Sequence, residues 1–90
     1  MTKRDRLRVI HDILNIIRRH NGAIKPTPLL RYSNLSSQNF SKYMEELKEK
    51  GFVEEKEGKK GRKEIVLTRR GSDYLQKYKV IVGIIDEFNL

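Results

Sequence analysis

The chain has 90 residues, 37% of them apolar, and it contains no cysteine. A chain of this length forms one small domain with a modest core, and without cysteine neither disulfides nor thiolate-bound zinc can stabilise it. Twenty Lys and Arg against twelve Asp and Glu give a net charge of +8, which favours a polyanionic partner. We therefore expect a single domain, with self-association as a further source of stability.

Residues 1–12, MTKRDRLRVIHD, carry closely spaced charges and no long apolar run. This pattern does not fit a signal peptide or a membrane span, so we expect an intracellular protein without a membrane partner. The basic residues Lys3, Arg4, Arg6 and Arg8 form either a basic arm or a solvated chain end.

Residues 4–20 have the spacing of a helix whose apolar face covers about half of its circumference. The apolar positions are Leu7, Val9, Ile10, Ile13, Leu14, Ile16 and Ile17. Asn21-Gly22 ends this helix. A short helical segment from Leu29 to Tyr32 follows, with Thr27 as its N-cap and Pro28 in its first turn.

A third helix is predicted for residues 36–50, with Ser36 at its N-cap and Gly51 at its C-cap. Its apolar side consists of Phe40, Tyr43, Met44 and Leu47. After it, residues 52–57 (FVEEKE) and 63–68 (KEIVLT) predict two strands joined by a glycine-rich turn.

Thr68 can cap a final helix that runs towards the C-terminus. Its apolar side chains follow at intervals of three and four residues, and a domain of this size cannot readily cover the whole stripe. We expect a homodimer interface formed by Tyr74, Tyr78, Ile81, Val82, Ile85 and Phe88. The alternative is that this stripe packs only on the chain's own core.

Three helices, a two-stranded hairpin and a final helix are the element order of a winged helix-turn-helix, a mainly α fold with a small β component. In this fold the third helix lies in the major groove of DNA and the hairpin forms the wing. We expect residues 1–68 to form the DNA-binding part of the domain and residues 69–90 its dimerisation helix.

The tip of the predicted hairpin reads EGKKGRK and carries Lys59, Lys60, Arg62 and Lys63. These charges repel one another in the free protein, and nearby phosphates relieve the repulsion. We therefore predict that they contact nucleic acid. The alternative is a solvated turn that only favours solubility.

On the predicted third helix, Gln38 and Lys42 point directly away from the apolar side, with Ser37 and Ser41 beside them. Such side chains can reach base edges or phosphates in a groove. The later turns carry three glutamates, which phosphates repel, so only the N-terminal half of the helix can enter the groove. The alternative is an ordinary amphipathic surface helix.

Arg69 and Arg70 fall in the first turn of the final helix, where positive charge opposes the helix dipole. An anionic partner would offset this effect. A DNA phosphate and a hairpin glutamate such as Glu54 are both possible partners.

Several short motifs support a family resemblance. They are Ser33-Asn34-Leu35-Ser36, Tyr43-Met44-Glu45-Glu46-Leu47, Gly51-Phe52-Val53, Leu67-Thr68-Arg69-Arg70-Gly71 and Tyr74-Leu75. In order and spacing they resemble the NLS, YLxxL, G(L/F)(I/V) and LTxxG elements of the small archaeal winged-helix DNA-binding proteins, over most of residues 5–78. The resemblance implies a dimer held by the C-terminal helix, double-stranded DNA as ligand, and a transcription regulator or chromatin protein. It places the start of the recognition helix on Ser36, Ser37 and Gln38, and the wing on residues 59–62.

Catalytic chemistry is not indicated. His11 and His20 have no acid and nucleophile pattern around them, and two histidines at this spacing do not form a zinc site. Gly58-Lys59-Lys60-Gly61 lacks the length and the following helix of a nucleotide-binding loop. We expect no enzyme, no metal and no cofactor.

The sequence therefore predicts a homodimeric protein that binds duplex DNA, regulates transcription and lies in the cytoplasm at the nucleoid. Three alternatives remain open at this point. They are an architectural chromatin protein, a module that binds structured RNA, and a winged helix that binds a protein partner instead.

Overall fold

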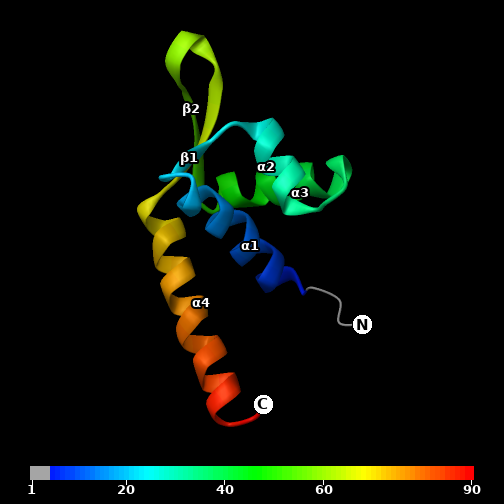
Figure 1. Cartoon of the computed structure of the whole chain (residues 1–90), viewed down its shortest axis with the longest axis vertical. Coiled ribbons are helices and arrows are strands. Elements are labelled where there is room, and N and C mark those ends of the chain that lie inside the picture. The colour runs from blue at the N-terminus through cyan, green and yellow to red at the C-terminus, as the bar shows by residue number, and fades with distance from the viewer. Residues whose placement is uncertain (1–4) are drawn as a thin grey trace.

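The described part of the chain, residues 5–90 of the computed structural model, consists of four α-helices and a small sheet. The helices are α1 (Arg6–Arg19), α2 (Pro26–Ser33), α3 (Ser37–Glu49) and α4 (Arg69–Glu87), and the strands are β1 (Ala23–Ile24), β2 (Val53–Glu57) and β3 (Lys63–Leu67). Figure 1 shows the β2–β3 hairpin projecting from one end of the molecule and α4 from the other. Lys3 and Arg4, part of the predicted basic arm, lie outside the described residues.

The sheet has three strands, in the order β1-β3-β2. The predicted hairpin is present, with antiparallel pairs running from Val53–Leu67 to Glu57–Lys63. β1 adds the pairs Ala23–Val66 and Ile24–Ile65 on the other side of β3. The predicted two-stranded hairpin is therefore confirmed, and the sheet has one strand more than predicted, because a strand of two residues is too short to show an alternating pattern.

One apolar core joins all of these elements. Its buried members are Val9, Ile10, Ile13, Leu14, Ile17, Ile24, Leu29, Phe40, Met44, Leu47, Val53, Ile65 and Leu75. Five of them come from α1, as the wide apolar face of that helix predicts. Leu7 is the exception on that face, because it lies in the exposed first turn of α1 and is 53% accessible to solvent.

The second helix begins earlier than predicted. α2 starts at Pro26, and its N-cap residue is Lys25, whose side chain makes no capping hydrogen bond. Thr27 lies inside the helix, so its predicted role as N-cap was wrong. A proline suits the first helical position because its φ is already helical and its missing N–H has no partner there in any case.

The turn between α2 and α3 is held by the motif Ser33-Asn34-Leu35-Ser36. The Ser33 hydroxyl is buried, donates to the Leu30 carbonyl at 2.7 Å and accepts from the Leu35 N–H at 3.3 Å. Asn34 takes the left-handed conformation with φ 60°. The Ser36 hydroxyl then accepts from the Asn39 N–H at 3.2 Å and caps α3. These local bonds fix the direction in which α3 leaves the turn.

The start of α4 lies on the turn between α3 and β2. The Thr68 hydroxyl donates to the Gly51 carbonyl at 2.6 Å and accepts from the Gly71 N–H at 3.1 Å, and the Thr68 N–H donates to the Phe52 carbonyl at 3.1 Å. A Cβ atom on Gly71 would collide with that Phe52 carbonyl and with Leu67. Gly71 is therefore required by close packing.

The first half of α4 packs on α1. Leu75 is buried, the Tyr74 hydroxyl donates to the Leu7 carbonyl at 2.8 Å, and the Tyr78 ring stacks on His11 with 4.5 Å between centroids. Burial raises the pKa of Tyr74, so its hydroxyl remains a hydrogen-bond donor at neutral pH. Residues 79–90 are all exposed, which explains the elongated dimensions of 49 × 27 × 22 Å.

Replacing Gly71 with alanine should lower the free energy of unfolding by about 1–3 kcal/mol, because the added methyl group overpacks the Phe52 carbonyl. Gly83 is a matched control in the same helix, since a Cβ there meets nothing within 4 Å. Gly83→Ala should leave stability equal or raise it by up to ~1 kcal/mol. Urea unfolding measures both variants, and equal midpoints would contradict the packing argument.

Candidate nucleic-acid interface

The wing is a hairpin with a tight, left-handed turn at its tip. Lys60 and Gly61 both have positive φ, 63° and 67°, and the Arg62 N–H points back to the Lys59 carbonyl at 3.5 Å. Positive φ at both central residues is the type I′ arrangement, which matches the twist of paired strands. The glycine-rich turn thus forms as predicted, although one of its two left-handed positions is a lysine.

Gly58 has a different role in this turn. Its φ of −89° is open to any residue, so conformational freedom is not what it provides. A Cβ atom on Gly58 would meet the end of the Glu64 side chain across the hairpin, so an alanine there would require only that this flexible carboxylate move. The Gly58 N–H donates to the Arg62 carbonyl at 2.6 Å, which extends the hairpin pairing up to the turn.

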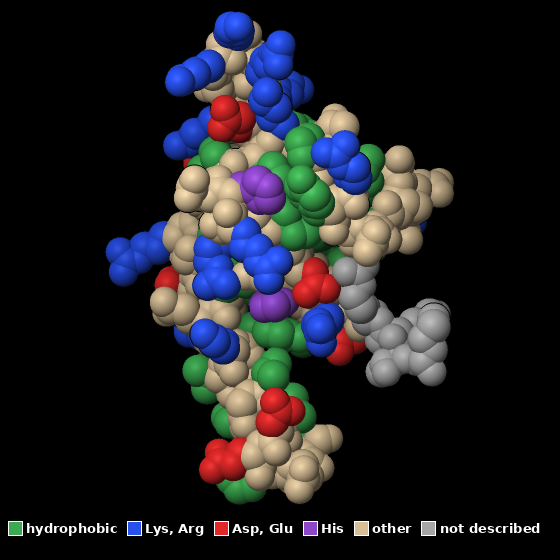
Figure 2. Space-filling model, viewed as in Figure 1, with side chains coloured by type: hydrophobic (Ala, Val, Ile, Leu, Met, Phe, Trp, Pro, Cys, Tyr) green, Lys and Arg blue, Asp and Glu red, His purple; other side chains and the backbone are tan. Residues whose placement is uncertain are grey.

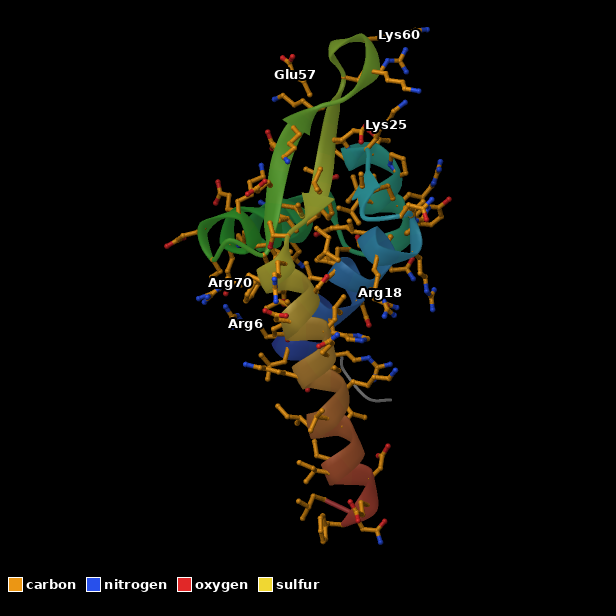
Figure 3. All side chains as sticks on the ribbon, turned by 90° about the vertical axis from the view of Figure 1, so that its left-hand side faces the viewer. Arg6, Arg18, Lys25, Glu57, Lys60 and Arg70 are labelled. Carbon is orange, nitrogen blue, oxygen red and sulfur yellow. The ribbon has the colours of Figure 1, made fainter. Side chains whose placement is uncertain are left out.

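The four predicted basic residues of the wing have different surroundings. Lys59, Lys60 and Arg62 are exposed and form no ion pair with any described residue. Figure 2 shows Lys and Arg side chains gathered at the hairpin tip, and Figure 3 places Lys60 at its end.

Lys63, by contrast, lies among carboxylates of its own sheet. It is paired in register with Glu57. The pKa of Glu55 is lowered, mainly by the hydrogen bond and charge of Lys48, and Lys63 adds to this effect. The charge of Lys63 is therefore partly balanced within the hairpin.

A hollow of about 350 Å³ separates the wing from the start of α2. It is lined by Lys25, Lys59, Lys60, Arg62 and Glu64. Lys25 was not among the residues predicted to bind DNA. Its position follows from β1, because the register that pairs Ile24 with Ile65 brings the next residue alongside Glu64 and the wing. Lys25 is a basic N-cap residue whose side chain makes no capping hydrogen bond, and this feature could have indicated that it binds an anion.

The outer face of α3 agrees with the predicted geometry. Ser37, Gln38, Ser41 and Lys42 are exposed, and the opposite side of the helix is buried in the core. The hydroxyl of Ser36, the remaining predicted residue, is engaged in capping the helix.

The acidic end of α3 is tied to the first helix. Glu46 forms an ion pair with Arg6 and lies 4.0 Å from the Lys50 ammonium. Arg8 in turn lies 3.6 Å from Asp12. The described members of the predicted basic arm, Arg6 and Arg8, are thus engaged within the chain.

Arg69 and Arg70 lie at the base of the hairpin, where α4 begins, and the structure does not bring them to the wing tip (Figure 3). The Arg70 guanidinium lies over the Phe52 ring, 5.6 Å from its centroid. Neither arginine forms an ion pair with a described residue. Glu54, the hairpin partner considered for them, lies 3.8 Å from Lys56 instead.

The residues predicted for a dimer interface fall into two groups. Tyr74 and Tyr78 contact α1 of the same chain. Ile81, Ile85 and Phe88 are 53%, 42% and 65% exposed. The remaining member, Val82, is exposed as well, together with the neighbouring side chains of Val80, Ile84 and Leu90.

The two histidines have ordinary helix-surface environments. His11 stacks on Tyr78, and the His20 Nδ1 lies 2.8 Å from the Ile16 carbonyl oxygen. Within residues 5–90 no group of three or more His, Asp or Glu side chains is placed to hold a metal ion. The described helices also include none with the length and apolar character needed to cross a membrane.

The buried turn between α2 and α3, the polar outer face of α3 and the basic hairpin after it together define a winged helix-turn-helix protein. The chain belongs to a winged helix-turn-helix family, whose model matches residues 3–85. The crystal structure of Sso10a-2, a DNA-binding protein from Sulfolobus solfataricus, is similar, with a TM-score of 0.76 and 19% identity over 96% of this chain and 86% of that one. No curated protein matches the sequence. The predicted fold and the resemblance to small archaeal winged-helix proteins are confirmed.

The left-handed conformation of Lys60 leads to a stability prediction. A residue with a Cβ atom pays roughly 1 kcal/mol for this conformation, and glycine does not. Lys60→Gly should therefore be about 1 kcal/mol more stable than Lys60→Ala in urea unfolding. Both variants remove the same charge, so the comparison isolates the backbone. Equal stabilities would show that the turn relaxes without cost.

Proposed function

We propose that the protein binds double-stranded DNA, with the N-terminal half of α3 in the major groove and the wing on the backbone or in the adjacent groove. The observation that carries this proposal is the group of Lys59, Lys60 and Arg62 at the wing tip, which forms no ion pair with any described residue. Like charges at such short spacing repel one another in the free protein, and nearby phosphates offset this repulsion.

The charge distribution on α3 supports the same docking. Gln38 and Lys42 are exposed on its N-terminal half, where a recognition helix contacts bases, and glutamates occupy its C-terminal half. The ion pair between Arg6 and Glu46 reduces the negative potential at that end of the helix. The fold shared with Sso10a-2, which is described as a DNA-binding protein, adds support.

We further propose that the protein is a homodimer and a regulator of transcription at the nucleoid, with residues 1–68 contacting DNA and residues 69–90 joining the two copies. The support for the dimer is the exposed apolar stripe of Ile81, Ile85 and Phe88 beyond the packed half of α4. Two linked DNA-binding surfaces bind two half-sites together, which raises both affinity and selectivity. Polar side chains on α3 that can read bases favour regulation over purely architectural binding.

A fluorescence-anisotropy titration with labelled duplex DNA at several salt concentrations tests the proposed binding. Replacing Lys59, Lys60 and Arg62 with alanine should lower the affinity for all sequences alike and reduce the salt slope by up to ~3, about one for each phosphate that the variant no longer neutralises. Replacing Arg18, Arg19 and Lys79 with alanine removes the same charge from exposed positions outside the wing and α3, and should change the slope far less.

Equal slopes in the two triple variants would remove the wing from the mechanism. Single-stranded DNA and duplex RNA serve as competitors in the same titration. Preferential displacement by duplex RNA, or no binding at micromolar protein in low salt, would contradict duplex DNA binding itself.

Replacing both Ile81 and Ile85 with glutamate should convert a dimer into a monomer, because charge on an apolar interface loses its hydration. Sedimentation equilibrium measures the mass directly. Gln76→Glu adds a charge to the same helix outside the stripe and should remain dimeric. An unchanged mass in the double variant, or a monomeric unmodified protein, would contradict the dimer.

A further inference from the structure

The hollow between the wing and α2 carries an unusual excess of positive charge. Four of its five lining side chains are cationic, and Glu64 is the only carboxylate among them, so three net positive charges face one hollow. The hollow has a volume of about 350 Å³ and is open to solvent. None of the four cations forms an ion pair with a described residue; they are Lys25, Lys59, Lys60 and Arg62.

The position of Lys25 is unfavourable in the free protein. It is the N-cap of α2, where positive charge opposes the helix dipole, and its side chain makes no capping bond. It also faces the cations of the wing across the hollow. An anion in the hollow would attract Lys25 and the wing cations, and this attraction would offset both unfavourable interactions.

Side chains, and not the end of the helix, must provide the binding. Pro26 and Pro28 remove two of the backbone N–H donors that a helix start normally offers to an anion. Flexible cations remain, and Lys binds phosphate as a point charge while Arg can bind it with two parallel hydrogen bonds.

We propose that this hollow is a phosphate site, in which Lys25 of the α1–α2 connection and Arg62 of the wing hold the same backbone phosphate of bound DNA. This inference rests on the proposed DNA binding. It makes that proposal more specific, because it places Lys25 and Arg62, which come from two parts of the protein chain, on the same phosphate of one DNA strand. Strand β1 explains why Lys25 lies close to the wing. β1 pairs with β3, and Lys25 directly follows β1. Figure 3 shows Lys25 below the hairpin tip, on the side of the hairpin to which Lys60 also points.

A double-mutant cycle tests whether the phosphate is shared. Because the two side chains hold the phosphate jointly, the loss of either one should release it. Lys25→Ala and Arg62→Ala should therefore each weaken duplex binding about 5- to 10-fold and each lower the salt slope by about one. The double variant should lower the slope by clearly less than two, because both side chains contact one phosphate. Lys25→Ala combined with Lys63→Ala is the control, since Lys63 lies on the same hairpin outside the hollow, and its effects should add.

A set of DNA duplexes, each with one backbone phosphate replaced by an uncharged methylphosphonate at a different position of one strand, identifies the phosphate that Lys25 and Arg62 contact. The unmodified protein should lose affinity most at one position, and both Lys25→Ala and Arg62→Ala should be insensitive at that same position. Glu64→Gln should strengthen DNA binding, because it removes the one carboxylate of the hollow.

A titration with inorganic phosphate at matched ionic strength tests whether the hollow also binds a free anion. The NMR signals of Lys25 are followed during the titration, and a saturable change supports the site.

The outcomes separate this inference from the proposed function. If the unmodified protein binds duplex DNA but Lys25→Ala binds equally well, or if Lys25 and Arg62 respond to different methylphosphonates, the shared site is wrong and DNA binding stands. If the unmodified protein does not bind duplex DNA, the proposed function itself is wrong. Thermal unfolding of Lys25→Ala confirms that the exposed side chain is not needed for folding.

Discussion

The hydroxyl of Thr68 holds together three parts of the molecule that are distant in sequence. It donates to the carbonyl of Gly51, where α3 ends, and it accepts from the N–H of Gly71, where α4 begins. Gly71 in turn lies against the carbonyl of Phe52 at the start of the wing. The end of α3, the start of the wing and the start of α4 therefore meet at one junction.

This junction also determines which surfaces are left uncovered. Because α4 must begin on the turn between α3 and β2, its first half reaches α1 and its second half extends past the end of the core. The apolar side chains beyond Tyr78 continue the helix past the stack of that ring on His11 and are exposed. Their exposure is thus a consequence of the fold, and burying them requires another surface.

The sequence predicted the helices and the hairpin because their information is local. Each of these elements is indicated by a pattern that spans only a few residues. The patterns are apolar residues at helical spacing, the N-caps Ser36 and Thr68, and two strands around a glycine-rich turn. β1 and the start of α2 were missed for a physical reason. Ala23 and Ile24 become a strand only through pairing with β3, and Pro26 begins a helix without any capping side chain.

The candidate site could be predicted only in part, because net charge does not say which charges are already neutralised. Arg6 and Lys48 are basic in the sequence but form ion pairs with Glu46 and Glu55 across the fold. Lys63 was expected to act with the wing tip, and the register places it opposite Glu57. Lys25 was not expected, yet strand pairing places it at the hollow. Ion pairs between elements, together with the register of the sheet, thus influence which of the described basic residues remain available for an anionic partner.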